Sequence, residues 1–574
     1  MNKLTIIVLI LGVLVLGTYV FMRSSLRMKH PRPVPKAKVR QETELDLRPL
    51  VVAKLQQLIK AASNGLYNFS ADSVRLDVLN STAELFDVTL SPDSAARKQL
   101  AVKRGLPDDV YRVRVKSLKI TGINIDDLLH RDRLDIGRIS IQAPVVDVYH
   151  QKQEYNAAEQ TAPSVKYQQL IGQMKHLGIA DIALMGGTIN VHNLSKAGKA
   201  THFNEVSVKI SKLLIDSASN DRVHFPKVET AVFSFRNYTD QTNDGLYTFS
   251  IGSGTADAVH HRLLAKDVHL TPNGGRQGFR SKLHFRKEMY TLTIGSASME
   301  NVSWWALANS EELTASDVTV SNARFDVFSD LSLPSSGRAD LRNFPDQKLM
   351  KIGLPVRVKH AHLKNISVSY EEYNPGIHKT GKVFFTQLDG EGSNITNIPA
   401  AIRENAISTV RANAQFLGQI PSRANLVFDL SKVRSGSFKV DFHMDKMDGS
   451  VLNPVAETMG YFSVKRGSME SGEAHLQGNN GSAKGTVLLL YNDLHITPLK
   501  KDPARPGELK KKSMTSLLAN KLFIKDNNPA NGQTRTSDCA LTRDPKGGSF
   551  FNFVWQTMMI GIFKTIGVPA RLAK

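Results

Sequence analysis

The sequence LYNFS at residues 66–70 recurs 180 residues later as LYTFS at 246–250, and DVTLSP at 87–92 then aligns with DVHLTP at 267–272. After one deleted residue the offset becomes 179 and is kept for the rest of the match. At this offset the aligned positions are Tyr111 and Tyr290, Leu134 and Leu313, 139–141 and 318–320, 147–149 and 326–328, Leu184 and Leu363, and Val191 and Tyr370. A long repeat of strand-like sequence predicts one β-rich unit used twice, with the two copies side by side.

Apolar and polar residues alternate along both copies, as they do in a strand with one buried face. In the first copy the apolar positions are Val113, Val115, Leu118, Ile120, Ile139, Ile141, Val146, Val148, Ile182, Leu184, Ile189, Val191, Val206, Val208 and Ile210. The sequence therefore predicts a mainly β fold with minor α, in which an elongated, twisted and mostly antiparallel sheet is made of two tandem repeats. A C-terminal β continuation and a terminal apolar helix are expected to complete the fold.

The chain is expected to be organised in seven segments. These are a transmembrane anchor at 1–22, a basic proline-containing stalk at 23–44, a helix plus the first repeat at 45–245, the second repeat at 246–395, a β continuation at 396–499, a basic polar loop at 500–549 and an apolar or amphipathic helix at 550–574. Apolar residues at helical spacing predict the helix at 45–62, which Asn64 and Gly65 would end. Short helices are expected at 125–129, 167–176 and 304–307.

The charge balance favours an anionic partner. Lys and Arg number 74 against 53 Asp and Glu, a formal net charge of +21, which suits nucleic acid or lipid headgroups. No helix-turn-helix, zinc-finger or RNA-recognition pattern is present, so nucleic acid is not expected as a partner. Cys539 is the only cysteine, which excludes an intrachain disulfide and any cysteine-cluster metal site. In polar sequence next to Asp538, this thiol is expected to be inert.

Residues 4–22 (LTIIVLILGVLVLGTYVFM) carry no charged side chain. As a helix they would be roughly 28 Å long, enough to span the hydrocarbon core of a bilayer. The residues assigned to this anchor are Leu4, Ile7, Leu11, Leu14, Tyr19 and Phe21. A cleaved signal peptide is the alternative, but the apolar run is long and no A-x-A site follows it. We therefore predict an uncleaved single-pass anchor.

The charges around the anchor leave its orientation open. Seven basic residues follow it between 23 and 40, whereas only Lys3 and the α-amine precede it. The positive-inside rule, applied directly, would place the large domain in the cytoplasm. Long domains, however, are translocated largely regardless of charge.

No catalytic or metal-binding constellation emerges from the sequence. Residues 376–383 (GIHKTGKV) approach a phosphate-binding P-loop, but Val383 replaces the hydroxyl residue that would hold Mg²⁺ and a strand is expected to follow, which predicts a hairpin turn. The histidines at 260–261 and at 360 and 362 lack carboxylates at ligand spacing. Asp147 and Asp326 are equivalent in the two copies, and a catalytic carboxylate pair is the alternative to a structural role at a strand edge or turn. We predict a non-enzymatic protein without cofactor or metal.

Residues 118–129 (LKITGINIDDLL) and 134–148 (LDIGRISIQAPVVDV) form a unit of strand, small helix, strand, proline and strand that resembles the AsmA-like envelope proteins. Residues 487–494 (VLLLYNDL) and 550–567 are similar to the end of such chains, and the resemblance covers most of 45–567. It rests on degenerate hydrophobic patterns. It implies an inner-membrane protein with a single anchor, a periplasmic domain, an extended β groove and a role in envelope maintenance linked to phospholipid movement. The strong positive charge and the basic flank after the anchor depart from the family pattern.

Two function hypotheses follow from the alternating pattern. In the first, the apolar face of the sheet is partly open and takes the acyl chains of a phospholipid, because too few amphipathic helices are readable between 66 and 500 to cover it. The groove candidates are Val113, Val115, Ile139, Ile141, Val146 and Val148 in the first copy, and Leu292, Ile294, Val318, Val320, Phe325 and Val327 in the second. In the second hypothesis the chain's own helices, 550–563 included, seal these side chains in a core, and the protein is an envelope scaffold or adaptor. The C-terminal helix is the expected contact for an envelope partner.

Overall fold

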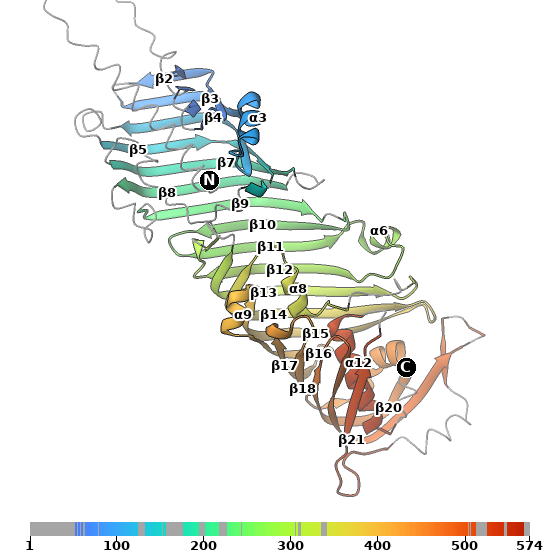
Figure 1. Ribbon diagram of the computed structural model, residues 1–574. Helices are drawn as coiled ribbons and strands as arrows, with labels where there is room; N and C mark the ends of the chain where they lie inside the picture. The colour runs from blue at the N-terminus through green and yellow to red at the C-terminus, as the bar shows by residue number, and fades with distance from the viewer. Residues whose placement is uncertain are drawn as a thin grey trace, which may run out of the picture. The chain divides into compact units, whose positions relative to one another are not determined.

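The computed structural model describes residues 52–567, with gaps at 54–55, 58, 61–62, 78–79, 124–132, 152, 156–175, 195–200, 217–226, 243, 305, 308–311, 335–340, 503, 506, 512–524 and 545–547. Over these residues the fold is mainly β, with a mixed, mostly antiparallel sheet of 23 strands, few helices and a C-terminal helix (Figure 1). The prediction of this fold class is confirmed at that level. The predicted anchor at 1–22 and stalk at 23–44 lie outside the described residues, as do the short helix expected at 125–129 and most of the one at 167–176.

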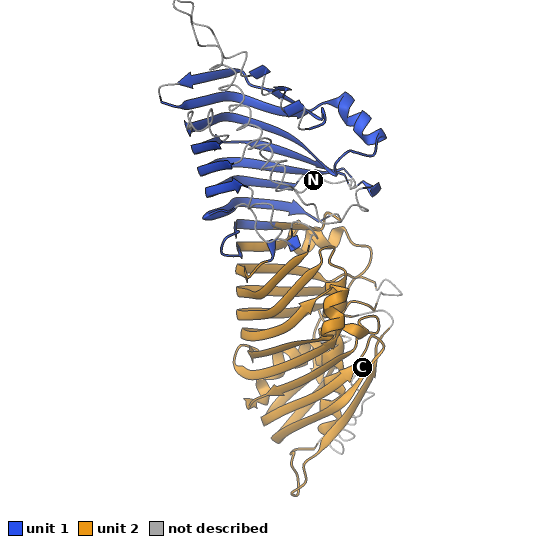
Figure 2. Cartoon of the chain, turned by 60° about the vertical axis from the view of Figure 1, so that its left-hand side comes forward, with its two compact units in different colours: residues 1–243, 250–265, 303–311 blue, residues 244–249, 266–302, 312–574 orange. Residues whose placement is uncertain are grey.

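The chain divides into two compact units (Figure 2). Unit 1 consists of residues 1–243, 250–265 and 303–311, and unit 2 of residues 244–249, 266–302 and 312–574. The elements of unit 1 are β1 (Tyr67–Ser70), β2 (Ser73–Asp77), β3 (Thr82–Pro92), α3 (Ser94–Val102), β4 (Asp109–Ile123), β5 (Arg133–Gln142), β6 (Val145–His150), β7 (His176–Asn193), β8 (Thr201–Asp216), β9 (Thr230–Gln241) and most of β10 (Tyr247–Asp257). Neighbouring strands are antiparallel, except that β7 runs parallel to both β5 and β6.

Unit 2 holds the longer strands and the C-terminal helix. Its elements are most of β11 (Arg262–Pro272), α6 (Gly275–Ser281), β12 (Met289–Glu300), β13 (Leu313–Asp330), α8 (Pro345–Met350), β14 (Val356–Asn374), β15 (Lys379–Thr396), α9 (Pro399–Glu404), β16 (Ile407–Phe416), β17 (Ile420–Asp429), η3 (Leu430–Lys432), β18 (Phe438–Met444), β19 (Met447–Asp448), η4 (Gly449–Leu452), α10 (Asn453–Val455), η5 (Ala456–Gly460), β20 (Phe462–Gly478), β21 (Ser482–Lys501), β22 (Leu509–Lys511), β23 (Thr536–Thr542) and α12 (Phe550–Thr565). Here β14 is parallel to β13. Residues 376–383 span the turn between β14 and β15 and the start of β15, as the hairpin prediction requires.

The same local features occur at positions that the sequence offset relates. The Tyr111 N–H donates to Tyr67 Oη at 3.1 Å, and the Tyr290 N–H donates to Tyr247 Oη at the same distance. Left-handed backbone also recurs in matched pairs, with φ of 47° and 54° at Asp87 and Asp267, 44° and 55° at Ala143 and Asn322, 68° and 53° at Gly122 and Asn301, and 66° and 54° at Gly186 and Asn365. Left-handed backbone is uncommon for residues other than glycine, so its recurrence at offsets of 180 and 179 residues indicates similar local structure in the two aligned segments.

The left-handed residue at 143 explains how two alternating runs share a face. Ile139 and Ile141 are odd-numbered, whereas Val146 and Val148 are even-numbered, so strict alternation would place the two runs on opposite faces of the sheet. Ala143 lies between them, and all four side chains contact the same apolar core of unit 1. Ile59, from a stretch whose described residues between 52 and 60 are helical, packs into that core as well.

At the C-terminus, α12 packs on β21 and β23 and covers apolar side chains of the C-terminal part of the sheet. The Phe550 ring lies 5.0 Å from Phe344 and 5.1 Å from Phe438, measured between centroids. β23 lies inside the stretch interpreted as a loop at 500–549, and the structure corrects that interpretation for Thr536–Thr542. This strand pairs with β21, and Cys539 is only 2% exposed because α12 covers it.

Candidate functional site

The six groove candidates of the first copy belong to a closed apolar core. Val113, Val115, Ile139 and Ile141 are between 1% and 9% exposed, and Val146 and Val148 are partly buried against the same cluster. These side chains therefore have little surface left for a ligand in the conformation described.

The six candidates of the second copy are more accessible. Leu292 and Ile294 on β12, and Val318, Val320, Phe325 and Val327 on β13, are all half-buried. Strand pairing places Leu292 opposite Phe325, and Val320 beside Leu363 of β14. We refer to this set of six half-buried side chains as the apolar track of the second copy.

One end of the apolar track carries polar groups that the sequence analysis did not single out. The Tyr290 ring stacks on Phe325 with centroids 5.9 Å apart, and its Oη donates to Glu288 Oε2 at 2.7 Å. Tyr370 Oη donates to Glu372 Oε2 at 3.0 Å. Burial raises the pKa of Glu372 above its ordinary value, against the lowering effect of the Tyr370 hydrogen bond and of Arg286. In the sequence, the alignment of Tyr111 with Tyr290 was the one feature that pointed to these polar groups at the end of the strands.

The two aspartates that suggested a catalytic pair each have structural partners within their own copy. Asp147 Oδ1 accepts from Asn190 Nδ2 at 2.7 Å, and Arg114 lies 3.5 Å away. Asp326 Oδ1 accepts from Ser369 Oγ at 2.5 Å, and Arg324 Nε lies 2.6 Å from the other oxygen. The Asn190 and Ser369 positions are related by the repeat offset, so equivalent residues hold equivalent carboxylates.

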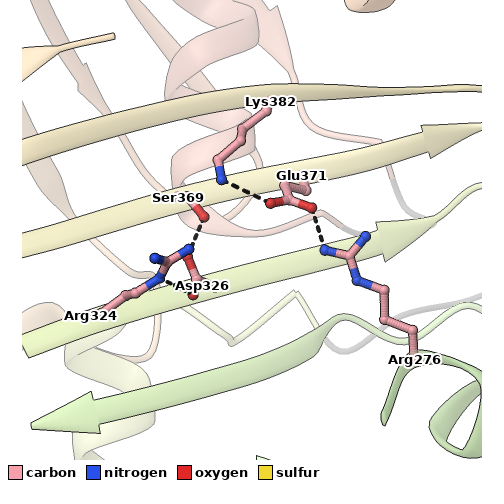
Figure 3. Close-up of polar contacts among 6 residues, drawn as sticks. All are labelled: Arg276, Arg324, Asp326, Ser369, Glu371 and Lys382. Carbon is pink, nitrogen blue, oxygen red and sulfur yellow. Dashed lines mark hydrogen bonds and ion pairs between the residues drawn. The ribbon is translucent and has the colours of Figure 1, made fainter. Parts of the chain in front are cut away.

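Figure 3 shows the ion pairs around Asp326 and the neighbouring Glu371, which lies between Lys382 and Arg276. Lys382 Nζ is 3.0 Å from the Glu371 carboxylate. Burial alone would raise the pKa of Glu371, but the hydrogen bonds from Lys382 and Arg276 outweigh it and lower that pKa. Burial acts in the same direction on Asp326, where Arg324 and Ser369 lower the pKa. These carboxylates are charged and paired, which is the arrangement of a structural network.

A shallow depression of about 1060 Å³ lies over strands β14 to β20 of unit 2. Cross-strand neighbours form a row along it: His362, Glu391, Arg411, Asn425, Asp441 and His475. His475 Nδ1 is 2.8 Å from Asp441 Oδ1. Charges of both signs line this surface, together with apolar side chains such as Leu363 and Phe442. Within the described part of the chain, no group of three His, Cys, Asp or Glu side chains could hold a metal ion.

Comparisons with known proteins leave the family open. No family model matches the chain, and no curated protein matches it. Among solved structures it is similar to a sex pheromone staph-cAM373 precursor, with 7% sequence identity and a TM-score of 0.13, over 64% of this chain and 98% of that chain. A similarity at that TM-score carries no argument about function. In the described ranges no helix is both long enough and apolar enough to cross a membrane, and the predicted anchor lies outside them.

Proposed function

We propose that this chain is a membrane-anchored, non-enzymatic envelope protein that binds phospholipid acyl chains and helps to move lipid. The observation that carries the proposal is the apolar track of the second copy, where six large apolar side chains on two adjacent strands stay half-buried. A contiguous apolar surface that is left uncovered on a folded domain marks a binding site, and we propose that these side chains provide such a surface.

The energetics favour acyl chains over a polar ligand at the track. Burying one CH₂ group gains about 0.8 kcal/mol, so even a partly covered acyl chain would gain several kcal/mol on valine, isoleucine and phenylalanine side chains. A headgroup would remain in water near the strand ends. We propose, on the same grounds, that the two aligned segments are tandem copies of one unit and that the second copy is the one that accepts lipid.

The resemblance to AsmA-like proteins supports the remaining parts of the proposal. These are a single anchor at 1–22 in the inner membrane and a large domain in the periplasm. The anchor charges argue against that orientation, so topology needs its own measurement by reporter fusion at the C-terminus.

A second candidate function is supported by a different observation. The first copy has a closed core, and α12 seals the C-terminal part of the sheet through Phe550 and Phe553. Such covered faces suit an envelope scaffold or adaptor without lipid cargo, because their apolar side chains contact only other parts of the same chain.

The experiment that separates the two functions is mass spectrometry of phospholipid that co-purifies with the full chain and with Val320→Asp. Because Val320 is half-buried, the variant is expected to stay folded and to lose most of its lipid. Two controls accompany it. Thr319→Asp, on the other face of the same strand, is expected to keep its lipid, and Ile139→Asp, at 1% exposure, is expected to unfold because it buries an unpaired carboxylate. A folded Val320→Asp protein with a full lipid complement would contradict the acyl-chain function.

A further inference from the structure

Helix α3 connects β3 to β4 in unit 1 and is attached to the sheet by few contacts. Asp93 caps it, accepting from the Ala95 and Ala96 N–H groups at 2.9 Å each. Leu100 packs partly against a small apolar cluster of Leu66, Leu106 and Val110. No residue of the helix is buried, so α3 contributes little to the core of the unit that carries it.

The outward side of α3 combines positive charge with an exposed apolar side chain. Ala95, Lys98, Gln99 and Val102 share one face at helical spacing, and all four are exposed. Val102 is 85% exposed, and Lys103 and Arg104 follow it directly. Figure 2 shows the helix standing beside the strand ends of unit 1.

The equivalent helix of the second copy, α6, is built differently. Its Phe279 is 3% exposed and packs with Leu246, Tyr247 and Met289. Its arginines are used internally, with Arg276 on Glu371 and Arg280 Nε 3.2 Å from Asp330.

By contrast, the side chains of Arg97, Lys98, Lys103 and Arg104 have neither an ion pair nor a side-chain hydrogen bond within the described ranges. Two helices at matched places in the repeat thus differ in one respect. The arginines of α6 are paired with carboxylates of its own sheet, whereas the basic residues of α3 and of the two positions after it face solvent.

We propose that α3 is a docking helix for an anionic lipid surface. Lysine and arginine side chains are attracted to the negative surface potential of a membrane that contains anionic lipids. An exposed valine between basic residues can enter the boundary between headgroups and acyl chains, which adds an apolar contribution. A nucleic acid would use the charges but would leave Val102 in water. The proposal does not depend on acyl chains binding to the second copy.

The test uses the full chain in vesicles, with a fluorophore on α3 introduced by Ala101→Cys. Cys539 can remain because it is 2% exposed. A nitroxide quencher is carried by the lipid headgroups, and vesicles of phosphatidylcholine alone are compared with vesicles that also contain phosphatidylglycerol. The matched control position is Ser281→Cys, which is exposed at the end of α6.

We expect quenching to be several-fold stronger at position 101 than at position 281. This difference should occur only in vesicles that contain phosphatidylglycerol, and it should decrease at high salt. The triple variant K98E/K103E/R104E should lose this quenching. A control with the same change in net charge, K439E/K465E/K484E, alters exposed lysines on β18, β20 and β21 and should retain it.

Equal quenching at the two positions, quenching that ignores lipid charge, or equal loss in both triple variants would overturn the docking role. The lipid content of the same preparations, measured by mass spectrometry, reports separately on the acyl-chain function. The two proposals can therefore fail independently.

Discussion

At the scale of single residues, Asp326 and Asp346 of unit 2 have pKa values shifted in opposite directions. Asp326 is held by Arg324 and Ser369, and these contacts lower its pKa against the effect of burial. Asp346 is 4% exposed, and among the described residues no side chain donates a hydrogen bond to its carboxylate. The nearby backbone N–H groups of Gln347 and of Asp346 itself lower its pKa less than burial raises it. Burial raises the pKa of Asp346 to about 6. The two groups should therefore affect stability in opposite directions as pH changes.

The sign follows from proton linkage. The folded state binds a proton at Asp346 more tightly than the unfolded chain, so its contribution to stability falls as pH rises from about 4 through 6. Asp346→Asn should therefore raise the thermal midpoint at pH 7.5, with a gain of about 1–2 kcal/mol, and raise it less at pH 5. Scanning calorimetry at both pH values measures this.

Asp326→Asn is the matched comparison for that experiment. The lowered pKa of Asp326 means that its stabilisation is present above the unfolded pKa and is lost as pH falls. This variant should lower the thermal midpoint at pH 7.5 and have a smaller effect in acid. An Asp346→Asn protein that is less stable at pH 7.5 than the parent would show that the Asp346 carboxylate has a partner in solution.

At the scale of elements, the packing of α12 depends on a glycine. A Cβ at Gly561 would lie 2.4 Å from Val487 Cγ2 and 2.7 Å from Val487 Cβ, and the latter atom is fixed to the β21 backbone. Helix and strand therefore approach closely because this position has no side chain.

Gly561→Ala should destabilise the protein by about 1–3 kcal/mol through overpacking, even though alanine is the better helix former. Gly353→Ala is the control, because a Cβ there meets nothing within 4 Å, and its effect should stay within about 1 kcal/mol. Thermal midpoints of the two variants give the comparison, and hydrogen exchange at β23 locates the loss. Equal midpoints for both variants would mean that α12 can shift away from β21 at little cost.

The elements also show which parts of the fold the sequence could reveal. Alternating runs such as 113–115 and 139–141 lie in strands because their period matches the pleat. The loop interpretation of 536–542 was wrong because the apolar surroundings of Cys539 and Leu541 come from β21 and α12, and β21 lies about fifty residues earlier in the sequence. Ala143 could not be recognised either, since left-handed backbone at an alanine has no local sequence signal.

At the scale of the whole molecule, the alignment of 66–150 with 246–329 could be made from the sequence, but the difference in burial between the two aligned segments could not be predicted from it. Alternation assigns an apolar face to each copy in the same way. The exposed fraction of the candidate side chains differs between the two segments. Those of the first segment pack into a core with Ile59 and its neighbours, whereas those of the second stay half-buried. Such a difference depends on which segments cover each face, and no local pattern in the strands encodes it.

That difference makes the last prediction specific to one copy. A photo-crosslinking phenylalanine analogue at Phe325, in the apolar track, should form phospholipid adducts in full-length protein in membranes. The same analogue at Phe438 should not, because that ring is 1% exposed and packed against Phe550. Both replacements keep an aromatic side chain, so folding should be preserved, with the larger steric cost at the buried site. Mass spectrometry of the crosslinked chain measures the phospholipid adducts at each position. Adducts at neither position in a preparation that still carries phospholipid would place the lipid elsewhere on the chain, and the half-buried track would then be only an incompletely covered part of the core.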